Sequence, residues 1–168
     1  MPMKRRPGTD DPDKPRRSAY DKALGLLARR EHSRKELKTK LRQGGYEGEE
    51  TADAIDRLGE QHYQDDDRFA EALLRGRIAQ GYGPMRLIAE LKSHGLADAR
   101  IRELMDAAEV DWEVSAATQL RRRYGRAGTS DPAERNRRAQ FLLRRGFAAA
   151  TVRRVTHAEV DEAADDMS

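Results

Sequence analysis

Residues Gly81 to Leu96 read Gly-Tyr-Gly-Pro-Met-Arg-Leu-Ile-Ala-Glu-Leu-Lys-Ser-His-Gly-Leu, a stretch that predicts one short helix with both ends marked. Pro84 suits the first helical position, because its missing N–H is not needed there and its φ is already helical. Gly95 suits the position after the helix, where a left-handed backbone costs little without a Cβ. Leu87 and Leu91 lie one turn apart on a single apolar face. Such a helix cannot bury that face alone, so we expect the rest of the chain to supply partner helices.

The same pattern recurs about 50 residues away in both directions, and this periodicity predicts a repeat protein. The equivalent residues are Leu37, Leu41 and Gly45 in the first copy, and Leu142 and Gly146 in the third. Each copy also carries a downstream pair of apolar residues three positions apart: Ile55 and Leu58, Ile101 and Leu104, and Val152 and Val155. The third copy departs once, because Arg138 stands at the position of Leu37 and Leu87. The predicted fold is therefore all-α, an elongated array of three tandem three-helix repeats with helix-turn-helix-like units.

The three repeats and the charged tails that flank them divide the chain into five predicted segments. They are a basic tail over 1–18, three repeats over 19–61, 62–108 and 109–156, and an acidic C-terminal tail over 157–168. The first tail holds four of the six prolines and little apolar surface. We expect it to be disordered, because it cannot bury enough surface to offset the cost of ordering.

Two motifs indicate helix starts. Ser33, followed three residues later by Glu36, forms a capping box that predicts a helix over 34–43. The run Asp65 to Asp67 could suggest a metal site, but no other acidic or His cluster has ligand spacing around it. We therefore expect Asp65 or Asp66 to cap the next helix, with the other carboxylates in its first turn.

Aromatic residues are expected to pack between repeats. Tyr63 and Phe69 lie near the start of the second repeat and are predicted core contacts. Trp112, the single tryptophan, is predicted to dock a helix on the preceding repeat, together with Val114, Ala116, Ala117 and Leu120. A role for Trp112 in a protein-binding hot spot is the alternative.

Composition favours thin helical layers over one thick core. Hydrophobic residues make up 37% of the chain and charged residues 38%, whereas globular domains usually hold about 45–50% apolar residues. The chain has no cysteine, which excludes disulfides and thiolate metal sites. No apolar run approaches the roughly 18 residues of a membrane span, so we expect a cytoplasmic protein without membrane contact. We expect a monomer, because no heptad seam is present.

Positive charge is concentrated in the third repeat, which indicates a charged partner. Residues 111–155 hold eleven arginines and four acids, whereas residues 59–110 hold seven basic and ten acidic residues. Like charges on one helix repel by a few tenths of a kcal/mol per pair, so this density favours an acidic partner or phosphates. A solvated arginine face is the ordinary alternative. The candidate partner- or nucleic-acid-binding residues are Arg121, Arg122, Arg123, Arg135, Arg137, Arg138, Arg144 and Arg145, with Lys35, Lys38 and Arg42 in the first repeat.

Catalytic motifs are lacking. The four histidines have no recurring metal-ligand spacing, and neither His-Glu-x-x-His nor Gly-x-x-x-x-Gly-Lys-Ser/Thr occurs. The Gly81-x-Gly83 pair lacks the third glycine and the preceding strand of a nucleotide fold. We therefore expect no enzymatic activity, no cofactor and no metal.

The segment Tyr63-Gln-Asp65-Asp66-Asp-Arg68-Phe69-Ala70 resembles the Gly-Tyr-Leu-Asp-Asp-x-Arg-Phe-Ala signature of the RecX family, regulators of the RecA recombinase. Further blocks agree in order and spacing: Ser33-Arg-Lys-Glu36-Leu37-xxx-Leu41-xx-Gly44, Gly81-x-Gly83-xxx-Ile88-xx-Leu91-xxx-Gly95, and Phe141-Leu-Leu143-Arg-Arg145-Gly146-Phe147. The resemblance spans about residues 19–155. His62, where the family usually has Gly, and Gln64, where it often has Leu, are its small departures.

The resemblance implies a negative regulator of RecA. It implies binding along the groove of the RecA–single-stranded DNA filament, and limits on filament extension, ATP hydrolysis, strand exchange and co-protease activity. The implied partners are the RecA filament and single-stranded DNA, contacted directly or within the filament. The alternative is a stand-alone DNA-binding module that uses the third repeat. The net acidic middle repeat favours the first reading, because a DNA clamp is expected to be basic throughout.

Overall fold

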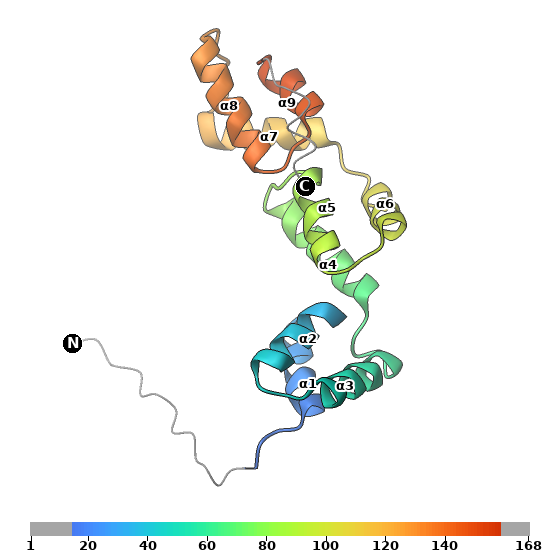
Figure 1. The fold of residues 1–168 in the computed structure, drawn as a ribbon. Helices are drawn as coiled ribbons and strands as arrows, with labels where there is room; N and C mark the ends of the chain where they lie inside the picture. Colours follow the sequence, from blue (N-terminus) through green and yellow to red (C-terminus); the bar gives the residue numbers. More distant parts are fainter. Residues whose placement is uncertain (1–14, 159–168) are drawn as a thin grey trace, which may run out of the picture.

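A computed structural model describes residues 15–158, and within them the chain forms nine α-helices and no strand (Figure 1). The helices are α1 Ala19–Arg29, α2 Arg34–Gln43, α3 Gly48–Glu60, α4 Asp66–Ala79, α5 Pro84–Ser93, α6 Asp98–Ala107, α7 Trp112–Tyr124, α8 Pro132–Arg144 and α9 Ala149–Thr156. They gather into three clusters that follow one another along the molecule, as an array of tandem three-helix repeats. The predicted all-α fold is confirmed. Most of the predicted basic tail and most of the predicted acidic tail lie outside the described residues.

Each repeat has its own small core. The buried residues come from equivalent positions of the three helices, as the periodicity predicted. They are Ala19, Ala23, Leu37, Leu41, Ala54, Ile55 and Leu58 in the first core, Ala70, Leu74, Leu87, Leu91, Ile101 and Leu104 in the second, and Ala116, Leu120, Ala139, Leu142, Phe147 and Val152 in the third. Burial of a Leu or Val side chain contributes about 1.5–3 kcal/mol, so each thin core stabilises its repeat only modestly.

The second helix of each repeat ends in the same way. Gly45, Gly95 and Gly146 adopt φ values of +83°, +85° and +91°. The residue after each glycine donates its N–H to a core leucine carbonyl, at 3.1 Å from Tyr46 to Leu41, 3.3 Å from Leu96 to Leu91 and 3.2 Å from Phe147 to Leu142. This is the Schellman arrangement, which pairs carbonyls that the helix end leaves open. The predicted left-handed cap at Gly95 is confirmed.

Two starts of second helices also follow the prediction. Ser33 Oγ accepts the N–H of Glu36 at 3.0 Å, and Pro84 occupies the first position of α5. The Glu36 carboxylate does not complete the predicted capping box, because it binds the Arg30 guanidinium instead.

Two side chains, those of Tyr63 and Val114, differ from their predicted places. Tyr63 is 53% exposed and Val114 is 59% exposed, so neither is the core contact predicted. Tyr63 lies in the turn between α3 and α4, and Val114 lies in the first turn of α7, on its solvent face. In the third repeat Ala139 occupies the core, while Arg138 lies at its edge with 15% side-chain exposure. Trp112 packs against both the second and the third core, as predicted.

The second helices of neighbouring repeats meet end to end. Between the second and third repeats, the Gly83 N–H donates to the Arg145 carbonyl and the Met85 N–H to the Gly146 carbonyl, both at 2.8 Å. The donors lie at the start of α5, which has no side-chain cap, and the acceptors follow α8. Each helix end thus satisfies groups that the other leaves unpaired, and the negative end of the α8 dipole lies against the positive end of the α5 dipole. We call these four residues the backbone clamp.

The corresponding contact between the first and second repeats uses side chains. Ser33, the N-cap of α2, places its Oγ 2.8 Å from Nδ1 of His94, the C-cap of α5. The array therefore has one junction fixed by backbone hydrogen bonds and one joined by side chains.

Candidate functional site

The segment that resembles the family signature forms the junction between the first and second repeats. Asp65 caps α4, accepting the N–H groups of Asp67 at 2.8 Å and Arg68 at 3.0 Å. This confirms the capping role predicted for the aspartate run. Asp66 has a second role that the sequence did not indicate, because its carboxylate accepts the Arg34 N–H at 2.9 Å, at the start of α2 in the other repeat.

The remaining signature residues hold the same junction. Arg68 binds the Glu31 carboxylate at 2.5 Å and donates to the backbone carbonyls of His62 and Tyr63 at 3.1 and 3.0 Å. It thereby fixes the turn before α4. Phe69 is buried, with its ring 4.5 Å from the His94 ring. Ala70 belongs to the second core. These contacts give the signature residues a structural role, as the joint between two repeats.

A buried histidine lies at this joint. His32 is 2% exposed, and its Nδ1 lies 2.9 Å from the Arg30 carbonyl oxygen. Burial lowers the pKa of His32, and this effect outweighs the opposite influence of the Arg30 carbonyl and of Glu36. The folded protein therefore favours the neutral imidazole.

Acidification from pH 7.5 to 5.5 is expected to lower the free energy of unfolding. The unfolded chain binds a proton at His32 near the ordinary pKa of about 6.5, whereas the folded chain resists it, so stability is lost as the pH falls through that value. The pKa values of Glu36 and Glu90 are lowered in the fold, so both stay ionised across this range. Thermal melting of the wild type and of His32→Gln at both pH values checks this. If acidification lowers the melting temperature of His32→Gln as much as that of the wild type, a group other than His32 causes the loss of stability.

At the other junction, arginine guanidinium groups and aromatic rings alternate in one row across two repeats. Going from the second repeat into the third, its members are Arg86, Tyr82, Arg145, Phe141, Arg123, Tyr124 and Arg138. Successive guanidinium-to-ring distances are 4.0, 5.0, 5.5, 5.4, 5.9 and 4.9 Å. Each contact contributes about 0.5–1 kcal/mol when exposed. We call this set the arginine–aromatic row.

A surface hollow of about 470 Å³ lies beside this row, lined by Gln80, Gln119, Arg122, Arg123, Phe141 and Arg145. Arg145 donates across the junction to the Gln80 carbonyl at 3.2 Å and, within its own repeat, to Gln119 Oε1 at 3.4 Å. Its Nε is buried and has no hydrogen-bond partner. The hollow thus combines three guanidinium groups, two of them on the exposed residues Arg122 and Arg123, a chemistry suited to phosphate or carboxylate oxygens.

The structure brings four of the predicted arginines to this hollow or row, namely Arg122, Arg123, Arg138 and Arg145. The others in the third repeat lie elsewhere. Arg121 is exposed and contacts Thr118, Arg135 binds the Thr129 carbonyl, Arg137 pairs with Glu134, and Arg144 is exposed at the end of α8. Lys35, Lys38 and Arg42 are exposed on α2 in the first repeat.

Sequence reasoning missed four members of the row, which are Tyr82 and Arg86 in the second repeat and Tyr124 and Phe141 in the third. Arg86 belongs to the net acidic second repeat, and the other three are uncharged, so charge counting gave none of them weight. The signal that could have found Tyr82 is the Gly81-Tyr82-Gly83 triplet, since glycine lets another part of the chain approach the backbone closely.

Across residues 15–158, no group of three or more His, Asp or Glu side chains is arranged to hold a metal ion. None of the helices in the same residues combines the length and apolarity needed to cross a bilayer.

Models of the three domains of the RecX family match this chain in order. The first three-helix domain matches residues 19–58, the second 65–105 and the third 111–156. The regulatory protein RecX of Stenotrophomonas maltophilia strain K279a is 46% identical over 159 residues, which cover 95% of this chain and 93% of that protein. The regulatory protein RecX of Xanthomonas axonopodis pv. citri strain 306 is 44% identical over 141 residues, 84% of this chain and 87% of that protein.

Solved structures share the fold. The crystal structure of RecX from Lactobacillus salivarius superposes with a TM-score of 0.63 at 24% identity, covering 83% of this chain and 92% of that one. A second crystal structure, of a regulatory protein RecX, gives a TM-score of 0.67 at 20% identity, covering 83% of this chain and 70% of that one. With three matching domains and close relatives along nearly its whole length, this chain belongs to the RecX family.

Proposed function

We propose that this protein is a non-catalytic, negative regulator of the RecA recombinase. It binds the RecA–single-stranded DNA filament along its groove and limits filament extension, ATP hydrolysis, strand exchange and co-protease activity. Its membership of a family of regulatory proteins supports this role, and the arginine–aromatic row is the structural observation that carries it.

The row is suited to contacting a polyanion within a filament. A guanidinium stacked on a ring is held in one orientation, so less side-chain entropy is lost when its N–H edge binds an oxygen. Because Arg86 and Arg138 stand at opposite ends and in different repeats, the row offers a line of contacts instead of a single point. Exposed DNA phosphates or RecA carboxylates fit this chemistry equally, and a RecA–DNA filament presents both.

The charge of the other repeats favours a mixed partner over bare DNA. The acidic residues of the second repeat outnumber its basic residues, and phosphates would be repelled there. A protein groove with charges of both signs avoids this conflict.

The deciding experiment is a titration of this protein into RecA during single-stranded-DNA-dependent ATP hydrolysis, with its own DNA binding measured at the same salt concentration. We expect inhibition below one protein per RecA protomer, at concentrations where the protein binds bare DNA poorly. Hydrolysis that continues unchanged at saturating protein contradicts the proposal.

The second candidate is a DNA-binding module that acts without RecA, and the row supports it as well. In that case inhibition begins only when the protein saturates the DNA. It also weakens steeply with salt, because each phosphate contact releases counterions.

A further inference from the structure

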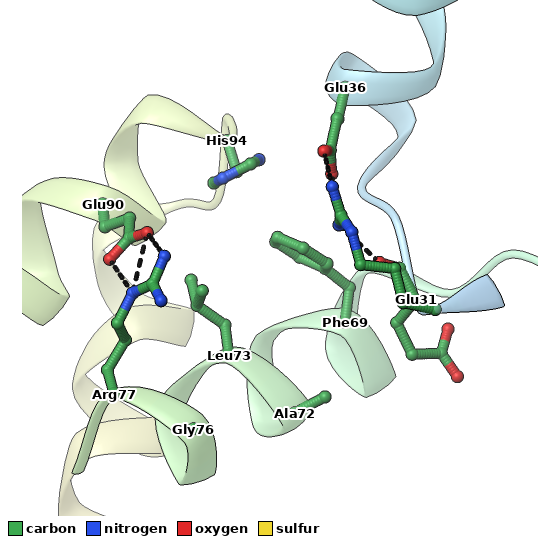
Figure 2. Close-up of a pocket in the computed structure, with 10 residues that line it drawn as sticks. Glu31, Glu36, Phe69, Ala72, Leu73, Gly76, Arg77, Glu90 and His94 are labelled. Atoms are coloured by element: carbon green, nitrogen blue, oxygen red, sulfur yellow. Dashed lines mark hydrogen bonds and ion pairs between the residues drawn. The ribbon is translucent and has the colours of Figure 1, made fainter. Parts of the chain in front are cut away.

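A cleft lies between the first repeat and the second (Figure 2), and none of its lining residues belongs to the arginine–aromatic row. We call it the junction cleft; its volume is about 470 Å³. The lining residues are Arg30, Glu31 and Glu36 from the first repeat, and Phe69, Ala72, Leu73, Gly76, Arg77, Glu90 and His94 from the second. The cleft is a surface feature between the two repeats and lies outside the packed interior of either core.

The floor of the cleft is apolar. Phe69, Ala72, Leu73 and Gly76 lie along one side of α4 and provide it (Figure 2). Ala72 and Leu73 are only partly buried, and a Cβ added at Gly76 would meet no atom within 4 Å. This surface therefore has room for an additional apolar side chain, which would be stabilised by leaving water.

The walls of the cleft carry ion pairs whose carboxylates are already occupied. The Glu36 carboxylate is bound by Arg30, and both Glu90 oxygens are bound by Arg77 at distances from 2.5 to 3.1 Å. The Arg77 hydrogen bonds lower the pKa of Glu90. Glu31 accepts from Arg68 at 2.5 Å. These carboxylates thus have little capacity left for a cationic ligand.

The arginines are the outer members of both wall pairs. The Arg30 side chain is 54% exposed and that of its partner Glu36 is 16% exposed; for Arg77 and Glu90 the values are 31% and 22%. Each guanidinium has five N–H groups. The bonds of Arg30 to Glu31 and Glu36 use three of them, which leaves two donors for a ligand at the rim.

We propose that the junction cleft binds a segment of a protein partner in which an apolar side chain is flanked by carboxylates. The apolar side chain packs on the floor, and the carboxylates accept from Arg30 and Arg77. A phosphate backbone has no apolar group to cover the floor, whereas a protein segment can present an apolar side chain next to carboxylates, so the lining as a whole favours protein over nucleic acid. The inference rests on the proposed function, because RecA is the partner with which it is tested.

The absence of cysteine allows a direct test with single-cysteine variants. Gly76→Cys places a thiol in the cleft, and Gly25→Cys, on α1, is its matched control. Both positions are exposed helical glycines with open space around the added Cβ. The measurement is the rate of maleimide alkylation with and without RecA filaments on single-stranded DNA. With filament at about ten times the dissociation constant, alkylation of Gly76→Cys should slow by about tenfold, because about a tenth of the protein stays unbound. Alkylation of Gly25→Cys should keep its rate.

A second pair of variants tests function. Gly76→Leu fills the cleft and is expected to weaken inhibition of RecA by at least about tenfold, as loss of a buried anchor does. Gly25→Leu should inhibit like the wild type. A photo-reactive maleimide on Gly76→Cys should join the protein to a RecA segment that has Asp or Glu beside an apolar residue.

Three results would overturn the inference. The first is that Gly76→Cys is alkylated at the same rate with and without filament while the wild type still inhibits RecA. The second is that bare single-stranded DNA alone protects the Gly76→Cys thiol. The third is that the photo-reactive group on Gly76→Cys cross-links to a basic segment of RecA. In each of these the regulatory function stands and the cleft assignment fails. If the wild-type protein leaves RecA activity unchanged, both the regulatory function and the inference are overturned. This outcome is distinguished from the other three because the wild-type measurement alone reveals it.

Discussion

Replacing Gly146 with alanine is expected to destabilise the protein by about 3 kcal/mol or more, from backbone strain together with overpacking. Gly146 has φ +91°, and a Cβ there would lie 2.7 Å from the Arg86 backbone nitrogen, closer than real Cβ contacts allow. The backbone clamp would have to open to make room, and Met85 would lose its acceptor. Urea unfolding at constant pH measures the change.

Gly95 provides the matched control for this experiment. Its φ of +85° is nearly the same, but an added Cβ meets only the Lys35 Cδ, at 3.9 Å. Gly95→Ala should therefore cost about 1 kcal/mol, the strain alone. Equal losses in the two variants would show that the close approach at the clamp does not limit stability.

Replacing Arg122 and Arg123 with alanine together is expected to weaken inhibition of RecA by at least about tenfold, equivalent to about 1.4 kcal/mol, as for loss of a hydrogen bond to a charged group. Both arginines line the hollow beside the arginine–aromatic row. Circular dichroism should stay that of the wild type, because both side chains are exposed. Inhibition of RecA ATP hydrolysis is the readout.

The control is the double variant Arg137→Ala and Arg154→Ala, which removes the same charge from the same repeat. Both side chains are exposed and paired with carboxylates, Glu134 and Glu113, outside the row. Inhibition by this variant should change little. If it falls as far as with the first pair, net charge alone determines binding and the row has no particular role.

The fold was predictable where a short stretch of sequence determines the local backbone structure. The proline and glycine that bound α5 and the Ser33 cap each act within one or two helical turns, and the 50-residue period is a repetition of such local signals. The aspartate run was correctly assigned to capping for the same reason. His62 shows why the family signature usually has a glycine there, since this residue adopts φ +61°.

The candidate sites were less predictable because they join residues distant in sequence. The stacking of Arg145 on Tyr82 depends on the backbone clamp, in which paired atoms are separated by a whole repeat. Backbone hydrogen bonds leave no mark in side-chain chemistry, so no pattern of charges could reveal them. Tyr63 was misplaced because burial of an aromatic residue in a turn is decided by the direction of that turn.

The two kinds of junction also have a consequence for the order in which the chain completes its structure during synthesis. Synthesis proceeds from the N-terminus, and domains generally fold as they emerge. The first repeat contains all of its own core and can close while the ribosome is still adding the second. The start of α5, by contrast, has no side-chain cap and receives its acceptors only when Arg145 and Gly146 have been added. Until most of the third repeat has been synthesised, the N–H groups of Gly83 and Met85 in the second repeat therefore lack their backbone acceptors.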